Sequence, residues 1–328
     1  MHLAAKCLLQ DTMMRSSLAR VSRQLSSRQL STKVGFVGLG AMGRHMAVNI
    51  AKSGTTTTVW DMSGDAVDFA VGKGCAGAAD AAGAVAGADV VFTSLPRSVD
   101  VEALADSLLA AGALPKNCVW VDTTSGVPDV SQRIYAKVAD ACGAKFLDCG
   151  VAGGPKGAEA GALAAMVGGD ADALETASPV MAHVMGKVVH VGPSGAGHAV
   201  KSVNNTLLAA HIWVAYEGLL TLAKLGVPME TALAAINAAS GRSLVTEERI
   251  PNHVLSREFD FGFALDLMRK DIGITMDTLD AIDMPAPALR VVNEMFCMGE
   301  AKLGPKAEHM EVVKVLEDMC GAQIKKAD

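Results

Sequence analysis

Lys201 and Asn205 are a pair of residues whose types and spacing could move a proton. They lie four residues apart in a segment that should form one long helix from His198 to Leu225, so both side chains lie on one face. A lysine near the N-terminus of a helix has its pKa lowered by the helix dipole. A lysine that exchanges protons near neutral pH needs such a lowered pKa. From the spacing alone, a solvated surface lysine is the alternative.

A second candidate site is a glycine-rich turn near the start of the chain. An apolar run at 34–37 leads into this turn, an amphipathic segment follows to about Lys52, and a β-rich run then reaches Asp61. Strand, glycine turn, helix, strand and acid in this order predict a dinucleotide site. The residues expected to bind the cofactor here are Gly38, Leu39, Gly40, Ala41, Met42, Gly43 and Asp61.

Each of the three glycines has a physical reason in such a site. Gly38 permits the tight turn, Gly40 lets the pyrophosphate approach the backbone, and Gly43 lets the helix lie close to the strand. The carboxylate of Asp61 would accept hydrogen bonds from the adenine ribose and repel a 2′-phosphate. The sequence therefore favours NAD over NADP.

Two further loops follow predicted strands, where ligands bind in a doubly wound sheet. Leu95 and Pro96 come after the strand at 89–94 and could line the cofactor cleft, although an ordinary proline-containing loop is the alternative. Gly153 and Gly154 come shortly after a strand at 144–148. Paired glycines can expose successive N–H groups that bind a carboxylate or an oxyanion, with a plain turn as the alternative.

The elements that must position these residues change character near residue 195. From 33 to 194, β-rich runs alternate with helical segments, which predicts an α/β domain of Rossmann type with a mostly parallel sheet. From 195 to 328 the apolar residues recur with the helical period, which predicts an all-helical domain. The long helix would join the two domains. Other expected elements are helices at 63–71, 80–86, 99–111, 127–142, 171–185, 229–239, 264–281, 286–298 and 306–320, and strands at 118–122, 162–168 and 187–191.

Composition argues against several functional classes. A net charge of −6 gives no reason to expect nucleic acid as a partner. The seven cysteines are scattered without Cys-x-x-Cys or Cys/His spacing, which indicates reduced thiols and no metal site. The longest apolar stretch, 206–223, contains His211, Tyr216 and Glu217. A buried helix of a soluble protein is therefore favoured over a membrane span.

The first 32 residues have the composition of a targeting segment. They are rich in serine, have no sustained apolar core, and carry Asp11 against the basic residues Lys6, Arg15, Arg20, Arg23 and Arg28. This pattern is typical of a mitochondrial transit peptide and predicts a location in the mitochondrial matrix. An untargeted disordered tail is the alternative.

Four motifs, in order and over residues 33 to about 320, resemble those of the β-hydroxyacid dehydrogenase family. The motifs are GFVGLGAMG at 35–43, DCGVAGGPKGAEAGALAAMVGG at 148–169, GAGHAVKSVNN at 195–205 and LMRKD at 267–271. They are similar to the family's opening fingerprint, its substrate loop, its segment with the catalytic lysine and its C-terminal cofactor motif. The likeness is greatest to the mitochondrial branch that oxidises 3-hydroxyisobutyrate.

The resemblance implies a role for each matching residue. Lys201 would be the general acid and base, and Asn205 would orient the substrate beside it. Cofactor contacts are implied for Leu95, Pro96, Asp100, Ser125 and Lys270. Substrate contacts are implied for Ala152, Gly153, Gly154, Asn205, Phe263 and Asp271. The resemblance also implies NAD as cofactor, no metal, a small 3-hydroxy acid as substrate, no membrane partner, and a homodimer or homotetramer. It implies that the helical domain at 195–328 serves substrate binding and dimerisation.

Three departures from the family pattern leave the identity of the hydroxy acid open. The family loop reads Asp-Ala-Pro-Val-Ser-Gly-Gly, whereas Cys149 and Gly150 here replace Ala-Pro, and Ala152 replaces a serine that contacts substrate. Losing one hydrogen bond to a charged group costs roughly 1.5–3 kcal/mol. Asp100 replaces an asparagine of the cofactor site.

The implied activity is NAD-dependent oxidation of 3-hydroxyisobutyrate to methylmalonate semialdehyde, a step of valine catabolism. One alternative within the family is a reductase of glyoxylate or succinic semialdehyde, which would draw on NADPH and is disfavoured by Asp61. The other is a non-catalytic dinucleotide-binding module. The 6-phosphogluconate branch is disfavoured because the helical part is too short.

Overall fold

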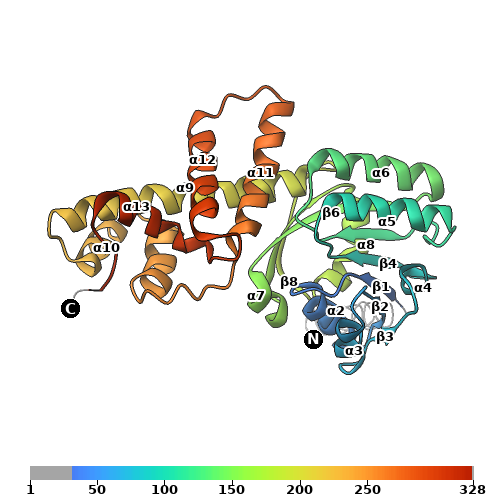
Figure 1. Ribbon diagram of the computed structural model, residues 1–328. Coiled ribbons are helices and arrows are strands. Elements are labelled where there is room, and N and C mark those ends of the chain that lie inside the picture. Colours follow the sequence, from blue (N-terminus) through green and yellow to red (C-terminus); the bar gives the residue numbers. More distant parts are fainter. Residues whose placement is uncertain (1–31, 327–328) are drawn as a thin grey trace, which may run out of the picture. The chain divides into compact units, whose positions relative to one another are not determined.

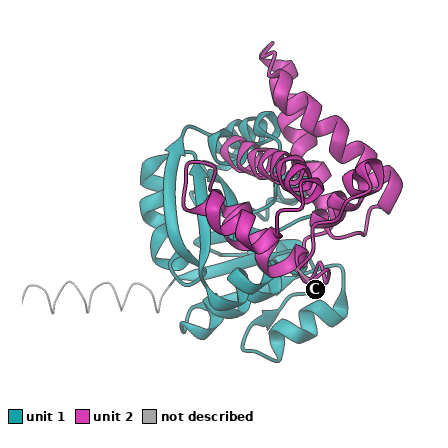
Figure 2. Cartoon of the chain, turned by 90° about the vertical axis from the view of Figure 1, so that its left-hand side faces the viewer, with its two compact units in different colours: residues 1–198 teal, residues 199–328 magenta. Residues whose placement is uncertain are grey.

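The computed structural model describes residues 32–326, which form two compact units (Figure 1). Unit 1 extends to His198, and unit 2 begins at Ala199; Figure 2 colours them teal and magenta. The leader predicted at residues 1–32 lies outside the described residues, apart from Thr32.

Unit 1 is built on an eight-stranded sheet of order β3-β2-β1-β4-β5-β6-β7-β8. Every neighbouring pair is parallel except β6 with β7, which is antiparallel. The strands are β1 (Lys33–Val37), β2 (Thr56–Trp60), β3 (Ala76–Gly77), β4 (Val90–Thr93), β5 (Val119–Asp122), β6 (Lys145–Ala152), β7 (Leu163–Gly168) and β8 (Met185–Gly192). The prediction of a mostly parallel sheet of Rossmann type is confirmed.

Helices cover both faces of this sheet, because alternate residues of the central strands enter two apolar clusters. Val34 and Phe36 of β1 and Phe92 of β4 belong to one cluster, together with residues of α2, α3 and α8. Val37 and Val91 belong to the other, with residues of α4, α5 and α6. The helices of unit 1 are α2 (Gly43–Lys52), α3 (Gly64–Val71), α4 (Ala81–Val85), α5 (Ser98–Ala110), α6 (Pro128–Cys142), α7 (Gly154–Ala160) and α8 (Ala171–Met181).

Unit 2 is helical, and its central element is α9 (Ala196–Lys224), whose first three residues belong to unit 1. The other helices are α10 (Met229–Asn237), η1 (Val245–Val254), α11 (Leu265–Ala281), α12 (Pro287–Leu303), η2 (His309–Val312) and α13 (Val313–Cys320). Of the described helices, α9 is the one long and apolar enough to cross a membrane by length and composition. Its residues Ile212, Trp213 and Tyr216 are buried in the core of unit 2. The hydroxyl of Tyr216 donates to the carbonyl of Met310 at 2.9 Å.

Several elements differ from the sequence-based expectation. β3 was not predicted, because two residues carry no periodic signal. β6 continues to Ala152 instead of ending at Asp148, because its ladder with β7 extends from Asp148 to Ala152. Helices α7 and η1 were not predicted. The sequence of α7 is rich in glycine and alanine, and η1 is a π-helix that contains Pro251. α8 ends at Met181 and not at 185, because the chain turns there into β8.

Candidate active site

The glycine turn between β1 and α2 has the backbone geometry of a dinucleotide site. Gly38 has φ +97°, and a Cβ there would lie 2.4 Å from the carbonyl oxygen of Ser94. A Cβ on Gly43 would lie 2.0 Å from the carbonyl oxygen of Gly38, so the helix could not approach the strand with any other residue. A Cβ on Gly40 would meet nothing within 4 Å, which leaves open space beside the first N–H groups of α2. This space, next to a helix N-terminus, fits a pyrophosphate.

Asp61 follows β2 and is bonded to the same turn. Its carboxylate accepts the N–H of Leu39 at 2.6 Å and the N–H of Ser63 at 2.8 Å. Each carboxylate oxygen has a further lone pair, so both remain able to accept from ribose hydroxyls. The acid therefore also holds the glycine turn in place, a contact that the sequence pattern did not reveal.

The loops after β4 and β5 lie side by side on the other flank of the glycine turn. The N–H of Leu95, after β4, donates to Oγ1 of Thr124, after β5, at 3.0 Å. The Cδ2 atom of Leu95 lies 2.9 Å from where a Cβ on Gly38 would stand. Pro96 and Ser125 are the next residues of these two loops. Leu95, Pro96 and Ser125 thus lie at the edge of the sheet where the order reverses around β1, which is where dinucleotides bind.

Asp100 has a different local role. It lies in the first turn of α5, and its carboxylate accepts from Nε of Arg97 at 3.1 Å and from Nη2 at 2.9 Å. The hydrogen bond from Arg97 holds the pKa of Asp100 below its ordinary value. The structure thus pairs Asp100 with Arg97, and the cofactor contact implied for it stays a prediction.

The predicted substrate loop begins later than the sequence suggested. Cys149 and Gly150 lie inside β6 and are buried, with the Cys149 thiol 3.9 Å from the sulfur of Met185. Burial raises the pKa of this thiol far above its ordinary value. The replacement of Ala-Pro by Cys149 and Gly150 is therefore a change inside β6 and not in the loop that follows this strand.

Gly153 and Gly154 stand at the carboxyl end of β6, the same edge of the sheet as the loops after β4 and β5. Their φ values are +129° and +62°, and a side chain at Gly154 would meet nothing within 4 Å. Ala152, the last residue of β6, is half-buried and brings no hydroxyl. The two glycines thus have the left-handed backbone that lets neighbouring N–H groups face one point.

Lys201 is a buried residue of α9, so the alternative of a solvated surface lysine is wrong. Lys201 is only 8% exposed, and its Nζ donates to Oδ1 of Asn205 at 3.1 Å. Burial is the largest cause that lowers the pKa of Lys201 below its ordinary value. The direction agrees with the expectation from the sequence, which rests on the helix dipole, but burial is its main physical cause. The charges of Asp271 and Lys270 act in opposite senses, Asp271 raising and Lys270 lowering the pKa of Lys201.

Asn205 connects Lys201 to Asp271 of α11. Its Nδ2 donates to Oδ2 of Asp271 at 2.6 Å, which fixes the amide so that Oδ1 faces Lys201. Asp271 is 3% exposed, its Oδ1 has no hydrogen-bond partner within residues 32–326, and Nζ of Lys270 lies 3.8 Å from that atom. The structure therefore brings Lys201, Asn205 and Asp271 into one buried group, with the half-buried Lys270 beside it.

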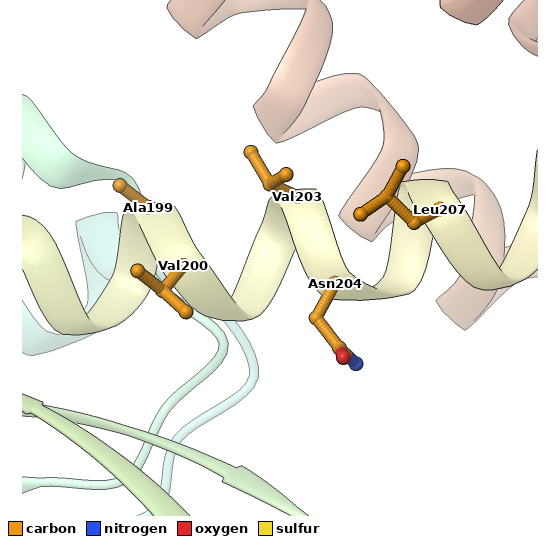
Figure 3. A pocket seen from close by; sticks show the side chains of 5 residues that line it. All are labelled: Ala199, Val200, Val203, Asn204 and Leu207. Carbon is orange, nitrogen blue, oxygen red and sulfur yellow. The ribbon is translucent and has the colours of Figure 1, made fainter. Parts of the chain in front are cut away.

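Phe263, the other residue implied in the substrate pocket, is half-buried just before α11. Its ring lies 5.3 Å from that of His309, and its carbonyl accepts the N–H of His309 at 3.0 Å. A shallow apolar hollow of about 360 Å³ on the surface of α9 is a separate feature (Figure 3). Its lining residues are Ala199, Val200, Val203, Asn204 and Leu207. Lys201 and Asn205 do not line this hollow.

Two family models match the chain. The model described as the NAD binding domain of 6-phosphogluconate dehydrogenase matches residues 33–192. The model described as NAD-binding of NADP-dependent 3-hydroxyisobutyrate dehydrogenase matches residues 195–316. The chain thus has the NAD-binding domains that its glycine turn indicated.

Individual relatives agree with this assignment. The 2-(hydroxymethyl)glutarate dehydrogenase of Eubacterium barkeri is 35% identical, over 90% of this chain and 98% of that protein. The NAD-dependent L-serine dehydrogenase of Pseudomonas aeruginosa is 36% identical, over 78% of this chain and 88% of that protein. A solved structure of Mycobacterium tuberculosis 3-hydroxyisobutyrate dehydrogenase with L-serine has a TM-score of 0.82 and 31% identity, covering 87% of this chain and 99% of that one. The chain therefore belongs to the β-hydroxyacid dehydrogenase family, the NAD-dependent oxidoreductases that act on the CH–OH group of small hydroxy acids.

Proposed function

We propose that the protein oxidises 3-hydroxyisobutyrate to methylmalonate semialdehyde with NAD⁺, as a step of valine catabolism, with Lys201 as the general base. The observation that carries the catalytic part is the burial of Lys201 against Asn205, with its pKa lowered by that burial. A buried lysine in a candidate active site is more often neutral than a surface lysine at the same pH. A neutral amine is what the removal of a hydroxyl proton requires.

The side chains around Lys201 orient its lone pair. Because Asn205 donates to Asp271, its carbonyl oxygen is left to accept one N–H of Lys201. The neutral amine then has its lone pair available for the proton of the substrate hydroxyl. Bound NAD⁺ supplies the acceptor for the hydride from the same carbon. The alcohol thus loses a hydride and a proton, and Lys201 holds the proton.

The comparisons suggest the chemical class of the substrate. 3-Hydroxyisobutyrate, L-serine and 2-(hydroxymethyl)glutarate, the compounds in the names of the relatives, share a primary alcohol next to a carbon that bears a carboxylate. They differ in the third substituent on that carbon, which is a methyl, an ammonium or a carboxyethyl group. In our proposal Lys201 acts on the shared alcohol, and the N–H groups of Gly153 and Gly154 hold the shared carboxylate. Ala152, which is apolar and brings no hydroxyl, favours the methyl group, with L-serine as the second candidate.

A reduction screen with NAD⁺ and NADP⁺ tests the substrate and the cofactor together. It should compare 3-hydroxyisobutyrate, L-serine, 2-(hydroxymethyl)glutarate, 3-hydroxypropionate, glycerate and 4-hydroxybutyrate. We expect the highest kcat/KM with 3-hydroxyisobutyrate and NAD⁺. NADP⁺ should be at least about tenfold poorer because the carboxylate of Asp61 repels the 2′-phosphate.

The other outcomes of the screen distinguish the alternatives. Faster oxidation of L-serine would show that the assignment of the methyl substituent is wrong. In a parallel assay of the reverse reaction, faster reduction of glyoxylate or succinic semialdehyde with NADPH would favour the reductase. Absence of activity on every compound would favour the non-catalytic dinucleotide-binding module.

We also propose that residues 1–32 direct the protein to the mitochondrial matrix, where it acts as a homodimer or homotetramer. The excess of arginine and serine over acidic residues supports the first part. A fusion of residues 1–32 to a fluorescent protein should enter mitochondria, and a cytosolic fusion would contradict the proposal. Light scattering of the protein from residue 33 onward would give the oligomeric state, and a monomer would contradict the second part.

A further inference from the structure

A buried polar cluster lies in unit 1 where β5 and β6 approach α9, and none of the roles above uses it. Asp122 ends β5, and its register partner Asp148 lies in β6. His198 lies in the first turn of α9 and is 1% exposed. Asp122 and Asp148 are also buried. Buried charged or titratable groups are costly, so their hydrogen bonds show what they hold in place.

Asp148 fixes the start of α9. Its Oδ1 accepts the N–H of Gly195 at 2.7 Å, and its Oδ2 accepts the N–H of His198 at 3.0 Å. A carboxylate at a helix N-terminus satisfies N–H groups that have no acceptor within the helix. A Cβ on Gly197 would lie 2.1 Å from the carbonyl oxygen of Asp148, so the helix and β6 are in direct backbone contact. The backbone of His198 is therefore held at a fixed place on the sheet.

The imidazole of His198 connects α6 with β5. Its Nδ1 lies 2.8 Å from the hydroxyl oxygen of Ser131 in α6. Its Nε2 lies 4.0 Å from Oδ2 of Asp122 and has no hydrogen-bond partner among the residues that the structure describes. The other oxygen of Asp122 accepts from Oγ1 of Thr93 at 2.7 Å and from the N–H of Thr124 at 3.1 Å. The ring is thus held between a hydroxyl on one side and a buried carboxylate on the other.

The same ring lies directly against the loop at 123–126. A Cβ on Gly126 would lie 2.2 Å from Nδ1 of His198 and 2.4 Å from its Cε1. The loop is also bonded to β4, because Oγ1 of Thr123 donates to the carbonyl of Thr93 at 2.7 Å. The loop is therefore hydrogen-bonded to β4 and to Asp122 and packs against the imidazole of His198. Ser125 lies between two of its residues that make these contacts, Thr124 and Gly126.

The position of this loop matters for the cofactor. The glycine turn after β1 and Asp61 after β2 account for the pyrophosphate and the adenosine half of a dinucleotide. The sheet order places β4 and β5 on the opposite side of β1, so the nicotinamide half has only the ends of these strands to lie on. The loop that carries Ser125 follows β5.

We propose that His198 is a positioning residue for the cofactor: its imidazole, held by Ser131 and Asp122, supports Gly126 and so fixes Ser125 at the nicotinamide side. This inference rests on the cofactor site proposed for Ser125 and is independent of which hydroxy acid is oxidised. It explains why Gly126 has no side chain and why a polar ring is buried at a point where an apolar residue would fill the space.

The test is a set of variants of the full-length protein, measured by NADH fluorescence titration, by KM and kcat, and by melting temperature. His198→Ala should raise the Kd for NADH and the KM for NAD⁺ about tenfold, with kcat within about twofold of wild type. His198→Gln, whose amide can still meet Ser131, should restore most of the affinity. His183→Ala, a half-buried histidine after α8, is the matched control and should leave the Kd for NADH unchanged.

A double-mutant cycle tests the contact itself. Gly126→Ala should weaken NADH binding because its methyl group meets the imidazole. In the His198→Ala background the same change should have little effect, because the ring is gone. Additive effects would overturn the proposal. An unchanged Kd for NADH in His198→Ala, with a lower melting temperature, would show a purely structural role and also overturn it.

Two further results separate the role proposed for His198 from the cofactor site on which that role rests. If His198→Ala does not fold, Ser131→Ala removes the hydrogen bond to Nδ1, together with the 3.2 Å bond from its hydroxyl to the carbonyl of Val127. This variant should still raise the Kd for NADH, and an unchanged value would refute the positioning role. If wild-type protein fails to bind NADH, the cofactor site as a whole is wrong. Normal binding by wild type with unaltered binding by all the variants contradicts the role of His198 alone.

Discussion

Lys201→Met should lower kcat for the alcohol by about 10²–10⁴-fold while the Kd for NADH stays within about twofold of wild type. Methionine fills a volume close to that of lysine and cannot accept a proton. The loss should therefore fall on turnover and leave the glycine turn and Asp61 of unit 1 unaffected. Stopped-flow or steady-state oxidation and NADH fluorescence titration give the two quantities.

Stability and a second lysine supply the controls. Burial disfavours the charged form of Lys201, so removing it should leave the melting temperature near pH 7 unchanged or raise it. Lys224→Met, at the other end of α9, should have normal kcat because its Nζ donates to the carbonyl of Cys320, far along the helix from Lys201. Turnover of Lys201→Met within about tenfold of wild type would refute the role of Lys201 as the proton acceptor.

The residues that sequence reasoning placed well are those whose partners lie nearby in the chain. The glycine turn from Gly38 to Gly43 and the strand that leads to Asp61 form one local unit, so their spacing alone predicts their geometry. Lys201 and Asn205 share a helix, so the four-residue interval predicts their contact, and the structure has their side chains 3.1 Å apart. The alternation of strands and helices in the first part of the chain predicted the sheet for the same reason.

No pattern in the sequence indicated the contacts between residues that lie far apart along the chain. Asn205 meets Asp271 across 66 residues, and no periodic pattern states which acid will meet a given amide. The contact between the imidazole of His198 and the backbone of Gly126 is likewise a property of the folded chain. Cys149 was read as a loop residue, because the sequence does not show that β6 gains length by pairing with β7. The segment 245–254 lacks the 3.6-residue period because it is a π-helix.

Asp271→Asn and Lys270→Gln should shift the pH dependence of alcohol oxidation in opposite directions. The charge of Asp271 raises the pKa of Lys201, and the charge of Lys270 lowers it. Oxidation requires neutral Lys201, so kcat rises with pH through the pKa of this lysine. Removing the negative charge in Asp271→Asn lowers that pKa and moves the rise to lower pH. Removing the positive charge in Lys270→Gln moves it to higher pH.

The measurement is kcat against pH in both directions of the reaction. Reduction of the aldehyde requires protonated Lys201, so its rate should fall with pH through the same pKa and shift with each variant in the same sense as oxidation. Asp271→Asn keeps an oxygen that can accept from Asn205, whereas Asp271→Ala removes it and should lower kcat further. Because Nζ of Lys270 lies 3.8 Å from Oδ1 of Asp271, the double variant should show partly cancelled shifts. Equal shifts in one direction for both single variants would mean that a group other than Lys201 controls the pH dependence.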